Sequence, residues 1–581
     1  MCGIAGFMAR PGRAAPAGLE ARFAAALAHR GPDGEGALRR DNVVLVHRRL
    51  AVIDPAGGRQ PLALPDGTAL VANAELYDYV ERRAELGGFA TGTDCEVALH
   101  LYRRDGEGFA DGLRGMYALA LHDPARRRLV LARDPFGIKP LYVAETEDGL
   151  AFASEAQALA AAGIVAPALA EGARDEVIAL QFSTGRATAL AGVERVLPGE
   201  TLVAEDGRIV ARRRRAALPA GGPQGWSDEE AEARLDAALT ESVALHGRAD
   251  VPCGLFLSGG TDSAAVLAAM RGAGARVRAY AIGIAGADER AHARRAAAAA
   301  GAELAETDLT AGDFWALLPA VAAALDDPAA DYAAVPTYKL AALAAREVKV
   351  VLTGEGGDEL FAGYGRYRAA LRPWWQGGRG ARLRHALAGL GVLRREPPAW
   401  RDGVAGAEAL AAGGGRTRLQ ALQAADVAEW LPNDLLLKLD RCLMAHGLEG
   451  RTPFLDPAVA AVAAGLSDRQ KVRGGAGKWL LRTWLQRRLP EAAPFARKRG
   501  FSVPVGAWIA AEGARLGPLV AAQPGVAAIA DPGAVAALFR RAAGRRAGAA
   551  AWRLLFYALW HRRHIEGRAA AGDTFAALAP M

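Results

Sequence analysis

Cysteine is scarce in this sequence, with four residues among 581. Cys2, Cys95, Cys253 and Cys442 stand far apart without a C-x-x-C pair, so we expect neither a disulfide framework nor a thiolate zinc site. A reducing, cytoplasmic location fits this usage. No apolar run approaches the roughly 20 residues of a membrane helix, and no basic segment precedes an apolar stretch at the start. We therefore expect no membrane partner and no export.

An excess of one charge sign is also nearly absent. Lys and Arg number 71 against 64 Asp and Glu, which gives a net charge of +7, and only residues 212–215 form a dense basic run. A protein that binds nucleic acid concentrates its positive charge on one face or stripe. The slightly basic balance is therefore weak evidence for a polyanion, and we expect no nucleic-acid partner.

The pattern of apolar residues divides the chain into two domains. Up to about residue 205, short strand-like runs such as 43-VVLVHRRLAVID alternate with Gly, Pro and Asp turns. Residues 211–229 are polar, contain Pro and Gly and lack periodicity, as is typical of a linker. From residue 230 onward, strand-like runs alternate with helical stretches, which predicts a parallel α/β sheet, and the sequence after 430 is mostly helical. We expect domains at 1–210 and 230–581.

The start of the chain offers a candidate nucleophile. Removal of Met1 would leave Cys2 with both a thiol and a free α-amine. An α-amine, with a pKa of about 7.7 to 8.0, can accept the proton of its own thiol near neutral pH. A lone cysteine is more often a small buried hydrophobe, so the surrounding motifs must decide between the two interpretations.

Five segments of the first domain provide those motifs: 29-HRGPDG, 47-HRRLAVID, 73-NAELYDY, 92-GTDCE and 133-RDPFGIKPLY. They closely resemble the class II, N-terminal-nucleophile glutamine amidotransferases. The resemblance implies an αββα sandwich of the Ntn-hydrolase type, in which Cys2 attacks the side-chain amide of glutamine and forms a glutamyl thioester. It also implies that Arg49 pairs with the substrate α-carboxylate, that Glu75 and Asp94 receive the α-ammonium group, that backbone groups of Val52 and Ile53 line the pocket, and that the Asn73 amide and the Ala74 N–H form the oxyanion hole.

Two positions in this region depart from the family pattern. The family usually has glycine where this chain has Ala74, and asparagine where it has Asp78. Alanine keeps the N–H that an oxyanion hole requires, but it lacks the freedom of glycine at positive φ. Glutaminase chemistry is therefore expected, and the sequence leaves open whether Ala74 weakens it.

A Gly-rich turn in 254-GLFLSGGTDSAAVLAAM links an apolar strand to an Ala-rich helix. Glycine lets the backbone approach phosphate, and a helix N-terminus favours negative charge. The motif is no P-loop, because the pattern G-x-x-x-x-G-K-S/T is absent. It resembles the pyrophosphate loop of the N-type ATP pyrophosphatases, which implies a HUP-like parallel-sheet domain that splits ATP into AMP and pyrophosphate. By this resemblance ATP contacts Phe256, Ser258, Gly259, Gly260, Asp262, Ser263, Ile282, Thr353, Gly354 and Lys478.

A second loop, 353-TGEGGDE, follows the predicted strand 348-VKVVL. In the asparagine synthetases, which this loop resembles, it closes over the activated aspartate. The resemblance implies that Glu355 is the general base for the attacking ammonia. It also implies that Asp262 and Asp358 bind Mg²⁺ on the pyrophosphate, as hard oxygen ligands of a hard cation.

A third segment, 431-LPNDLLLKLDRCLMAHGLEGRTPFLD, also closely resembles the asparagine synthetases. It contains Lys438, Asp440, Arg441 and Glu449. In the family this segment packs near the active site. An interpretation that the sequence supports at least as well is that these four residues form a buried polar network.

The order of the two resemblances, glutaminase before ATP pyrophosphatase, is that of glutamine-dependent asparagine synthetases. This family implies glutamine, aspartate and ATP as substrates, Mg²⁺ as the cofactor, and asparagine, AMP and pyrophosphate as products. Ammonia would need a dry channel between the two sites to stay unprotonated. A homodimer is compatible with the resemblance, and no sequence feature decides it.

Three other functions remain open. The first is a related amidotransferase that acts on another carboxylate, in a polysaccharide, a natural product or a peptide. The second is a nucleic-acid-directed pyrophosphatase, which would not need the glutaminase motifs. The third is a catalytically inactive, regulatory relative.

Overall fold

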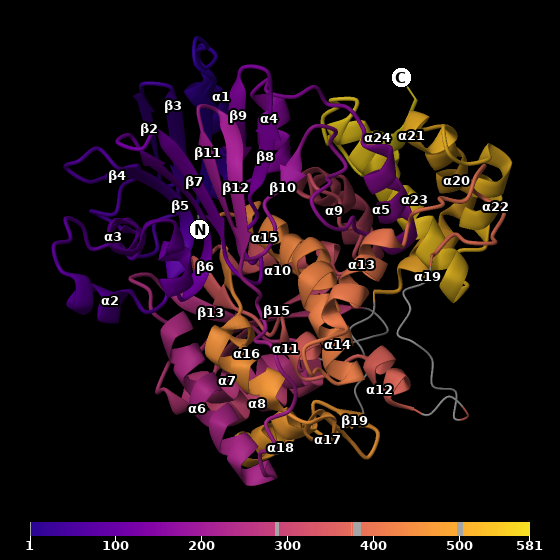
Figure 1. Cartoon of the computed structure of the whole chain (residues 1–581). Helices are drawn as coiled ribbons and strands as arrows, with labels where there is room; N and C mark the ends of the chain where they lie inside the picture. The colour runs from indigo at the N-terminus through magenta and orange to yellow at the C-terminus, as the bar shows by residue number, and fades with distance from the viewer. Residues whose placement is uncertain (1, 285–289, 373–374, 376–384, 497–502, 581) are drawn as a thin grey trace.

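The first domain contains two six-stranded antiparallel sheets packed face to face (Figure 1). The computed structural model describes residues 2–284, 290–372, 375, 385–496 and 503–580. The first sheet has the strand order β10-β8-β9-β1-β3-β2, and the second has the order β12-β11-β7-β6-β5-β4. Their bounds are β1 Gly3–Ala9, β2 Gly34–Arg40, β3 Val43–Arg49, β4 Leu62–Ala63, β5 Ala69–Leu76, β6 Gly115–Asp123, β7 Arg128–Arg133, β8 Tyr142–Glu145, β9 Gly149–Ala153, β10 Glu194–Arg195, β11 Glu200–Glu205 and β12 Arg208–Arg214.

The alternation of side chains along the strands explains why helices cover both outer faces. In β6, Ala118 and Ala120 pack into the core between the sheets, whereas Tyr117 and Leu119 point to the opposite face. That outer face packs against α3, and α1 and α4 cover the outer face of the first sheet. The four layers confirm the αββα sandwich expected from the resemblance. The helices are α1 Leu19–Ala26, α2 Tyr79–Leu86, α3 Glu96–Asp105, α4 Ala156–Ala161 and α5 Glu171–Leu180.

The second domain is organised around a five-stranded parallel sheet with the order β15-β14-β13-β16-β17. From β13 the chain builds the sheet in one direction to β15, and then returns to the other side of β13 with β16. The strand order therefore reverses between β13 and β16, where ligands bind at the carboxyl ends of an open α/β sheet. The strands are β13 Cys253–Phe256, β14 Arg278–Ile284, β15 Glu303–Leu309, β16 Val350–Leu352 and β17 Glu449–Arg451.

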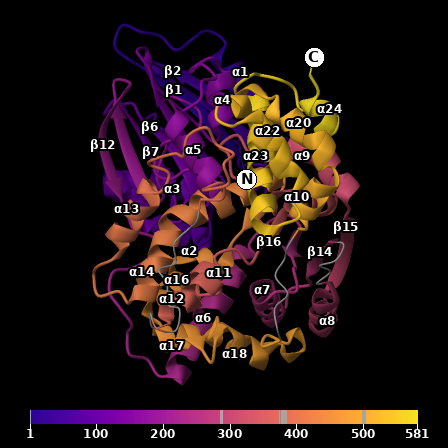
Figure 2. The ribbon, with the colours of Figure 1, turned by 90° about the vertical axis from the view of Figure 1, so that its right-hand side faces the viewer.

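Helices bury both faces of this sheet, as the continuous apolar strand runs predict. One face packs against α6, α7, α8, α16 and α18, and the other packs against α9, α10, α15 and the C-terminal helices (Figures 1 and 2). The parallel α/β domain with a helical C-terminal part is confirmed.

Within the described residues, no helix is long and apolar enough to cross a membrane. The larger helices are α6 Asp228–His246, α7 Thr261–Gly272, α8 Arg290–Ala300, α9 Ala311–Ala324, α10 Ala334–Ala344, α13 Asp402–Ala411, α14 Arg418–Ala425, α15 Leu437–Met444, α16 Pro457–Gly465, α18 Trp479–Arg488, α20 Gly513–Ala521, α22 Pro532–Arg540 and α23 Arg545–His564. Shorter elements are α11 Gly357–Leu360, α12 Gly365–Leu371, α17 Asp468–Lys471, α19 Val505–Ala511, α21 Pro524–Ala527, α24 Thr574–Leu578, β18 Val472–Arg473 and β19 Ala476–Gly477.

Most of the basic run at residues 212–215 belongs to strand β12 of the first domain. Strand β12 continues to Arg214, four residues into the segment expected as a linker. Arg212 pairs with Glu194 at 3.1 Å, and Arg213 pairs with Asp111. A run whose charges contact carboxylates of its own domain is no free phosphate-binding stripe.

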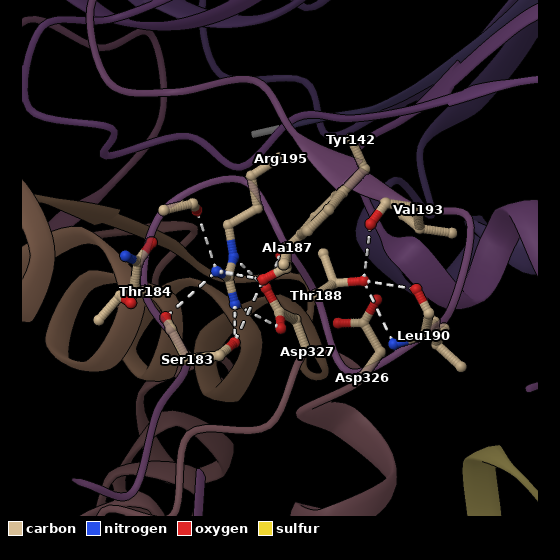
Figure 3. A network of polar contacts seen from close by, with 12 residues as sticks. Tyr142, Ser183, Thr184, Ala187, Thr188, Leu190, Val193, Arg195, Asp326 and Asp327 are labelled. Carbon is tan, nitrogen blue, oxygen red and sulfur yellow. Dashed lines mark hydrogen bonds and ion pairs between the residues drawn. The ribbon is translucent and has the colours of Figure 1, made fainter. Parts of the chain in front are cut away.

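Buried ion pairs cross the boundary between the two domains. Arg195 of the first domain reaches Asp327, in the segment between α9 and α10, with Nε at 2.6 Å and Nη2 at 2.7 Å (Figure 3). Its remaining donors contact the Ser183 hydroxyl and backbone carbonyl groups. The Tyr142 hydroxyl donates to the same carboxylate at 3.1 Å.

A second group of buried charges lies nearer to Cys2. Arg30 donates to both carboxylate oxygens of Asp440 in α15, at 2.8 and 3.1 Å. Arg441, the next residue in α15, donates to Asp326 at 2.6 Å and to Asp440 at 3.0 Å. The side chains of Arg30, Arg441 and Asp326 are fully buried. Asp440 and Arg441 thus belong to a buried polar network that joins the domains.

We expect Arg441→Met to lower the free energy of unfolding by about 3 to 5 kcal/mol, because it leaves Asp326 and Asp440 buried with too little positive charge. Urea denaturation measures this change. Arg276→Met is the control, because the exposed pair of Arg276 with Glu303 contributes little. Equal effects of the two substitutions would contradict the assigned role.

Candidate active sites

A pocket in the first domain surrounds the thiol of Cys2, which stands directly before β1. Burial raises the pKa of the Cys2 thiol above its usual value, so the thiol is protonated at neutral pH and needs a base. Cys2 and the predicted glutamine-binding residues come together here from four separate segments of the chain. The lining residues are Cys2, Arg49, Leu50, Val52, Ile53, Gly58, Gln60, Ala74, Glu75, Thr93, Asp94, Cys95 and Glu449.

Asn73 lies beside Cys2 at the carboxyl half of β5. Its Oδ1 accepts the Cys2 N–H at 3.0 Å. Its Nδ2 is buried and has no hydrogen-bond acceptor in the part of the chain that the structure describes. Ala74 continues β5 in regular antiparallel pairing with Tyr117, so its backbone is extended and does not require the freedom of glycine. The alanine therefore fits this position without strain.

Three charged side chains give the pocket its polarity. Arg49 is mostly buried and donates to the carbonyls of Pro55 at 2.9 Å and Asp54 at 2.6 Å. Asp94 accepts the Leu76 N–H at 2.7 Å, and burial raises the pKa of its carboxyl. Burial also raises the pKa of Glu75 well above its usual value. The charge of Arg451 opposes this shift in the pKa of Glu75. A ligand that carries both a carboxylate and an ammonium would meet the Arg49 guanidinium and these two carboxyl groups in one pocket.

In the second domain, two loops meet at the carboxyl ends of β13 and β16. The Ser258 N–H donates to Ser263 Oγ at 3.2 Å, and this hydroxyl donates to the Gly260 carbonyl at 3.3 Å. The first loop is thereby curled over the N-terminus of α7. A Cβ on Gly354 would lie 2.8 Å from the Asp262 Cβ, so the second loop packs directly on the first. The predicted ATP residues at the strand ends, Phe256, Ile282 and Thr353, lie on β13, on β14 and after β16.

The carboxylates predicted to bind a metal converge on one cation. Lys478 Nζ pairs with Asp358 Oδ1 at 2.5 Å and also with Asp262. Lys478 precedes α18 with a φ of 57°, which directs the chain into that helix. Two carboxylates that share one positive group are hard oxygen donors of the kind that Mg²⁺ prefers, so the donor set fits this ion.

Glu355 lies in the second loop, close to Lys438 and Asp331. The sequence did not indicate that these three residues lie together. Lys438 Nζ is 4.0 Å from Glu355 Oε1 and 2.8 Å from Asp331 Oδ2. Burial raises the pKa of Glu355, and the charge of Lys438 opposes this shift. A carboxylate with a raised pKa is a better proton acceptor than an exposed one.

Sequence reasoning missed Asp331 at these sites, and it named Glu449 without indicating its site. Asp331 carries no motif of its own, and its place beside Lys438 depends on the packing of α10 against α15. Glu449 lines the Cys2 pocket although it belongs to the second domain. The resemblance of its segment to a known family was the one available signal, and it did not indicate which site the residue serves.

The comparisons with known proteins agree with this geometry. A family described as asparagine synthase matches residues 234–562, more than half of the chain, and a glutamine amidotransferase domain matches residues 1–214. The chain belongs to the asparagine synthase family. It is a glutamine-hydrolysing ligase of the asparagine synthetase type, and ATP use is expected of this family.

Curated relatives extend over most of the chain. A putative glutamine-hydrolyzing asparagine synthetase of Mycobacterium tuberculosis is 34% identical and covers 97% of this chain and 98% of its own length. Glutamine-hydrolyzing asparagine synthetase 1 of Bacillus subtilis is 33% identical over 83% of each chain. Amidase chyE of Penicillium rubens is 32% identical over 64% of this chain and 60% of its own.

We expect Gly357→Ala to reduce ATP-dependent AMP release by about tenfold to a hundredfold, because the new Cβ would lie 2.6 Å from Asp262 Oδ1 and push the loops apart. The matched control is Gly172→Ala, since a Cβ there meets open space. Unchanged AMP release in a folded Gly357→Ala protein would show that the loop contact is not needed.

Proposed function

We propose that this protein makes asparagine in two half-reactions at the two sites described above. The Cys2 pocket hydrolyses glutamine to glutamate and ammonia. The second domain activates the β-carboxylate of aspartate with ATP, and ammonia converts the resulting β-aspartyl-AMP to asparagine. The observation that carries this proposal is the convergence of Cys2, Arg49, Glu75 and Asp94 on one pocket.

In the glutaminase half-reaction, the α-amine that Cys2 exposes once Met1 is removed accepts the thiol proton. Met1 lies outside the described residues. The thiolate attacks the amide carbon of glutamine, and the Asn73 Nδ2 and the Ala74 N–H stabilise the oxyanion. The α-ammonium group of Cys2 then returns the proton to the amide nitrogen. The C–N bond breaks, and ammonia is released. Water then hydrolyses the thioester to glutamate and restores the thiol.

Substrate orientation follows from the charges of the pocket. The guanidinium of Arg49 offers paired donors to the α-carboxylate. Asp94 and Glu75 would receive the α-ammonium of glutamine, and Val52 and Ile53 line the same pocket. This polarity favours a free amino acid, because a glutamine residue within a peptide lacks both charges.

In the synthetase half-reaction, a β-carboxylate oxygen of aspartate attacks the α-phosphorus of ATP and pyrophosphate leaves. The loop around Gly259 and Gly260 brings backbone close to the phosphates, and Lys478 offsets their charge. Mg²⁺ held by Asp262 and Asp358 would neutralise charge on the departing pyrophosphate. Ammonia then attacks the acyl carbon of β-aspartyl-AMP, Glu355 accepts a proton from the attacking nitrogen, and AMP leaves.

A second candidate is an amidotransferase with another carboxylate acceptor. The similarity to amidase chyE supports it, because relatives of this architecture are not all described as asparagine synthetases. The two candidates share the glutaminase half-reaction and differ in the acid that the second domain activates.

We expect Cys2→Ala to abolish glutamine-driven synthesis and to leave ammonia-driven synthesis near the wild-type rate, because only the first site needs the thiol. Product formation is measured with each nitrogen source. Cys253→Ala is the control and should use glutamine normally, since this cysteine does not line the pocket. Glutamine-driven synthesis by folded Cys2→Ala protein would refute the proposed nucleophile.

AMP release measured with a panel of carboxylic acids identifies the acceptor. We expect L-aspartate to stimulate ATP-dependent AMP release. Its shorter homologue, aminomalonate, and its longer homologue, glutamate, should stimulate it far less. Absence of stimulation by aspartate, with stimulation by another acid, would replace the asparagine assignment with the second candidate.

A further inference from the structure

The second domain supplies part of the wall of the Cys2 pocket. Glu449, in the edge strand β17, lines this pocket together with residues of the first domain. Gly450 follows it, and a Cβ there would lie 2.9 Å from Leu443, so that side of the strand faces α15. Glu449 and Arg451 are two residues apart and therefore share the opposite face, toward the first domain.

Arg451 lies directly behind Glu75. Its Nη2 is 3.0 Å from Glu75 Oε2 across the domain boundary, and its Nε donates to Glu449 Oε1 at 2.7 Å. Nη1 donates to the backbone carbonyls of His246 and Arg248 at 2.8 and 2.6 Å, which fixes the guanidinium in place. The side chain of Arg451 is completely buried, so these contacts are not weakened by solvent.

The charges of the pocket require such a cation. Glu75, Asp94 and Glu449 are all at least 96% buried, and a bound glutamine brings only one ammonium group. Carboxylates that share a buried space repel one another and take up protons unless positive charge is near. Arg451 lies between Glu75 and Glu449, and its charge opposes the rise that burial causes in the pKa of Glu75. Despite burial, the pKa of Glu449 is lowered to about 2, first by the positive charge of the N-terminal amine and then by Arg451 and Lys139.

The backbone of Arg451 also belongs to the nucleotide site. Arg451 pairs with Leu352 of β16 in the parallel sheet, and its carbonyl accepts the Thr353 N–H at 2.8 Å. Thr353 begins the loop that contains Glu355. The side chain of Arg451 therefore contacts two residues that line the proposed glutamine site, Glu75 and Glu449, and its main chain contacts the loop of the proposed ATP site.

We propose that Arg451 is a positioning residue for the glutamine pocket: by holding Glu75 and Glu449, this residue of the second domain keeps the Cys2 site in the form that binds glutamine. The inference rests on the proposed hydrolysis of glutamine at Cys2 and names a determinant of glutamine affinity that lies outside the glutaminase domain. The second domain thereby completes the first site.

The test compares the KM for glutamine with the KM for ammonia in full-length Arg451→Met and Arg451→Lys. We expect Arg451→Met to raise the KM for glutamine about tenfold or more, because breaking a buried charge pair leaves its partner uncompensated. The KM and rate with ammonia should stay within about twofold of wild type, because the substitution keeps the main-chain contact of residue 451 with Thr353. Activity with ammonia also shows that the protein is folded. Arg451→Lys should be intermediate, because a point charge cannot hold both carboxylates as the guanidinium fork does.

A double-mutant cycle identifies Glu75 as the partner. If Arg451 acts through Glu75, the double variant Glu75→Gln/Arg451→Met should raise the KM for glutamine no further than the more severe single variant. Arg195→Met is the matched control, because Arg195 is also a buried arginine paired across the domain boundary (Figure 3). Arg195 does not line the Cys2 pocket. This substitution should lower stability and leave the KM for glutamine unchanged.

An unchanged KM for glutamine in folded Arg451→Met would overturn the inference, as would fully additive effects in the cycle. If Arg451→Met does not fold, Arg451→Lys decides by the same measurement, and an unchanged KM again overturns it. Failure of the proposed function is distinguishable, because Cys2→Ala would then retain glutamine-driven synthesis. Loss of that synthesis in Cys2→Ala, together with normal glutamine affinity in the Arg451 variants, would refute only the role of Arg451.

Discussion

The buried ion pairs between the domains are the interaction on which the arrangement of the two sites depends. Arg30 reaches Asp440 in α15, and Arg195 reaches Asp327 ahead of α10, with almost no exposure to water. Buried charges are costly unless their partners are correctly placed, so they penalise any other relative orientation of the domains. This specificity keeps the pocket around Cys2 in contact with β17, and β17 belongs to the sheet that carries the two loops proposed to bind ATP.

Each site uses a general property of its fold. In the antiparallel sandwich, β1 and β5 bring Cys2 beside Asn73 at one end of the sheets. In the parallel sheet, the reversal of strand order next to β13 opens a place for a ligand, and the loops after β13 and β16 fill its edge with glycines and carboxylates. The sites differ in charge. The first balances carboxylates with arginines, whereas the second brings Asp262 and Asp358 together on Lys478.

Much of the fold follows from local patterns. Alternating apolar residues with tight turns predicted the strand-rich first domain, and alternating strands and helices predicted the parallel sheet. The end of the first domain was harder to place, because β12 is polar on an exposed edge and resembles a linker in sequence. At Ala74, the sequence did not show whether the backbone needs the conformational freedom of glycine. The structure shows that Ala74 is extended in β5, so alanine fits there.

The sequence by itself determined which residue types were available for chemistry, because motifs such as SGGTDS, and Cys2 at the start of the chain, are local and carry their meaning in their order. The tertiary structure decided which residues act together. Glu449 and Arg451 lie more than 350 residues from Glu75 in the chain, yet they meet it at the Cys2 pocket. Asp331 likewise reaches Lys438 only through helix packing. Contacts of this kind depend on the docking of whole domains and helices, and short-range sequence patterns do not encode that docking.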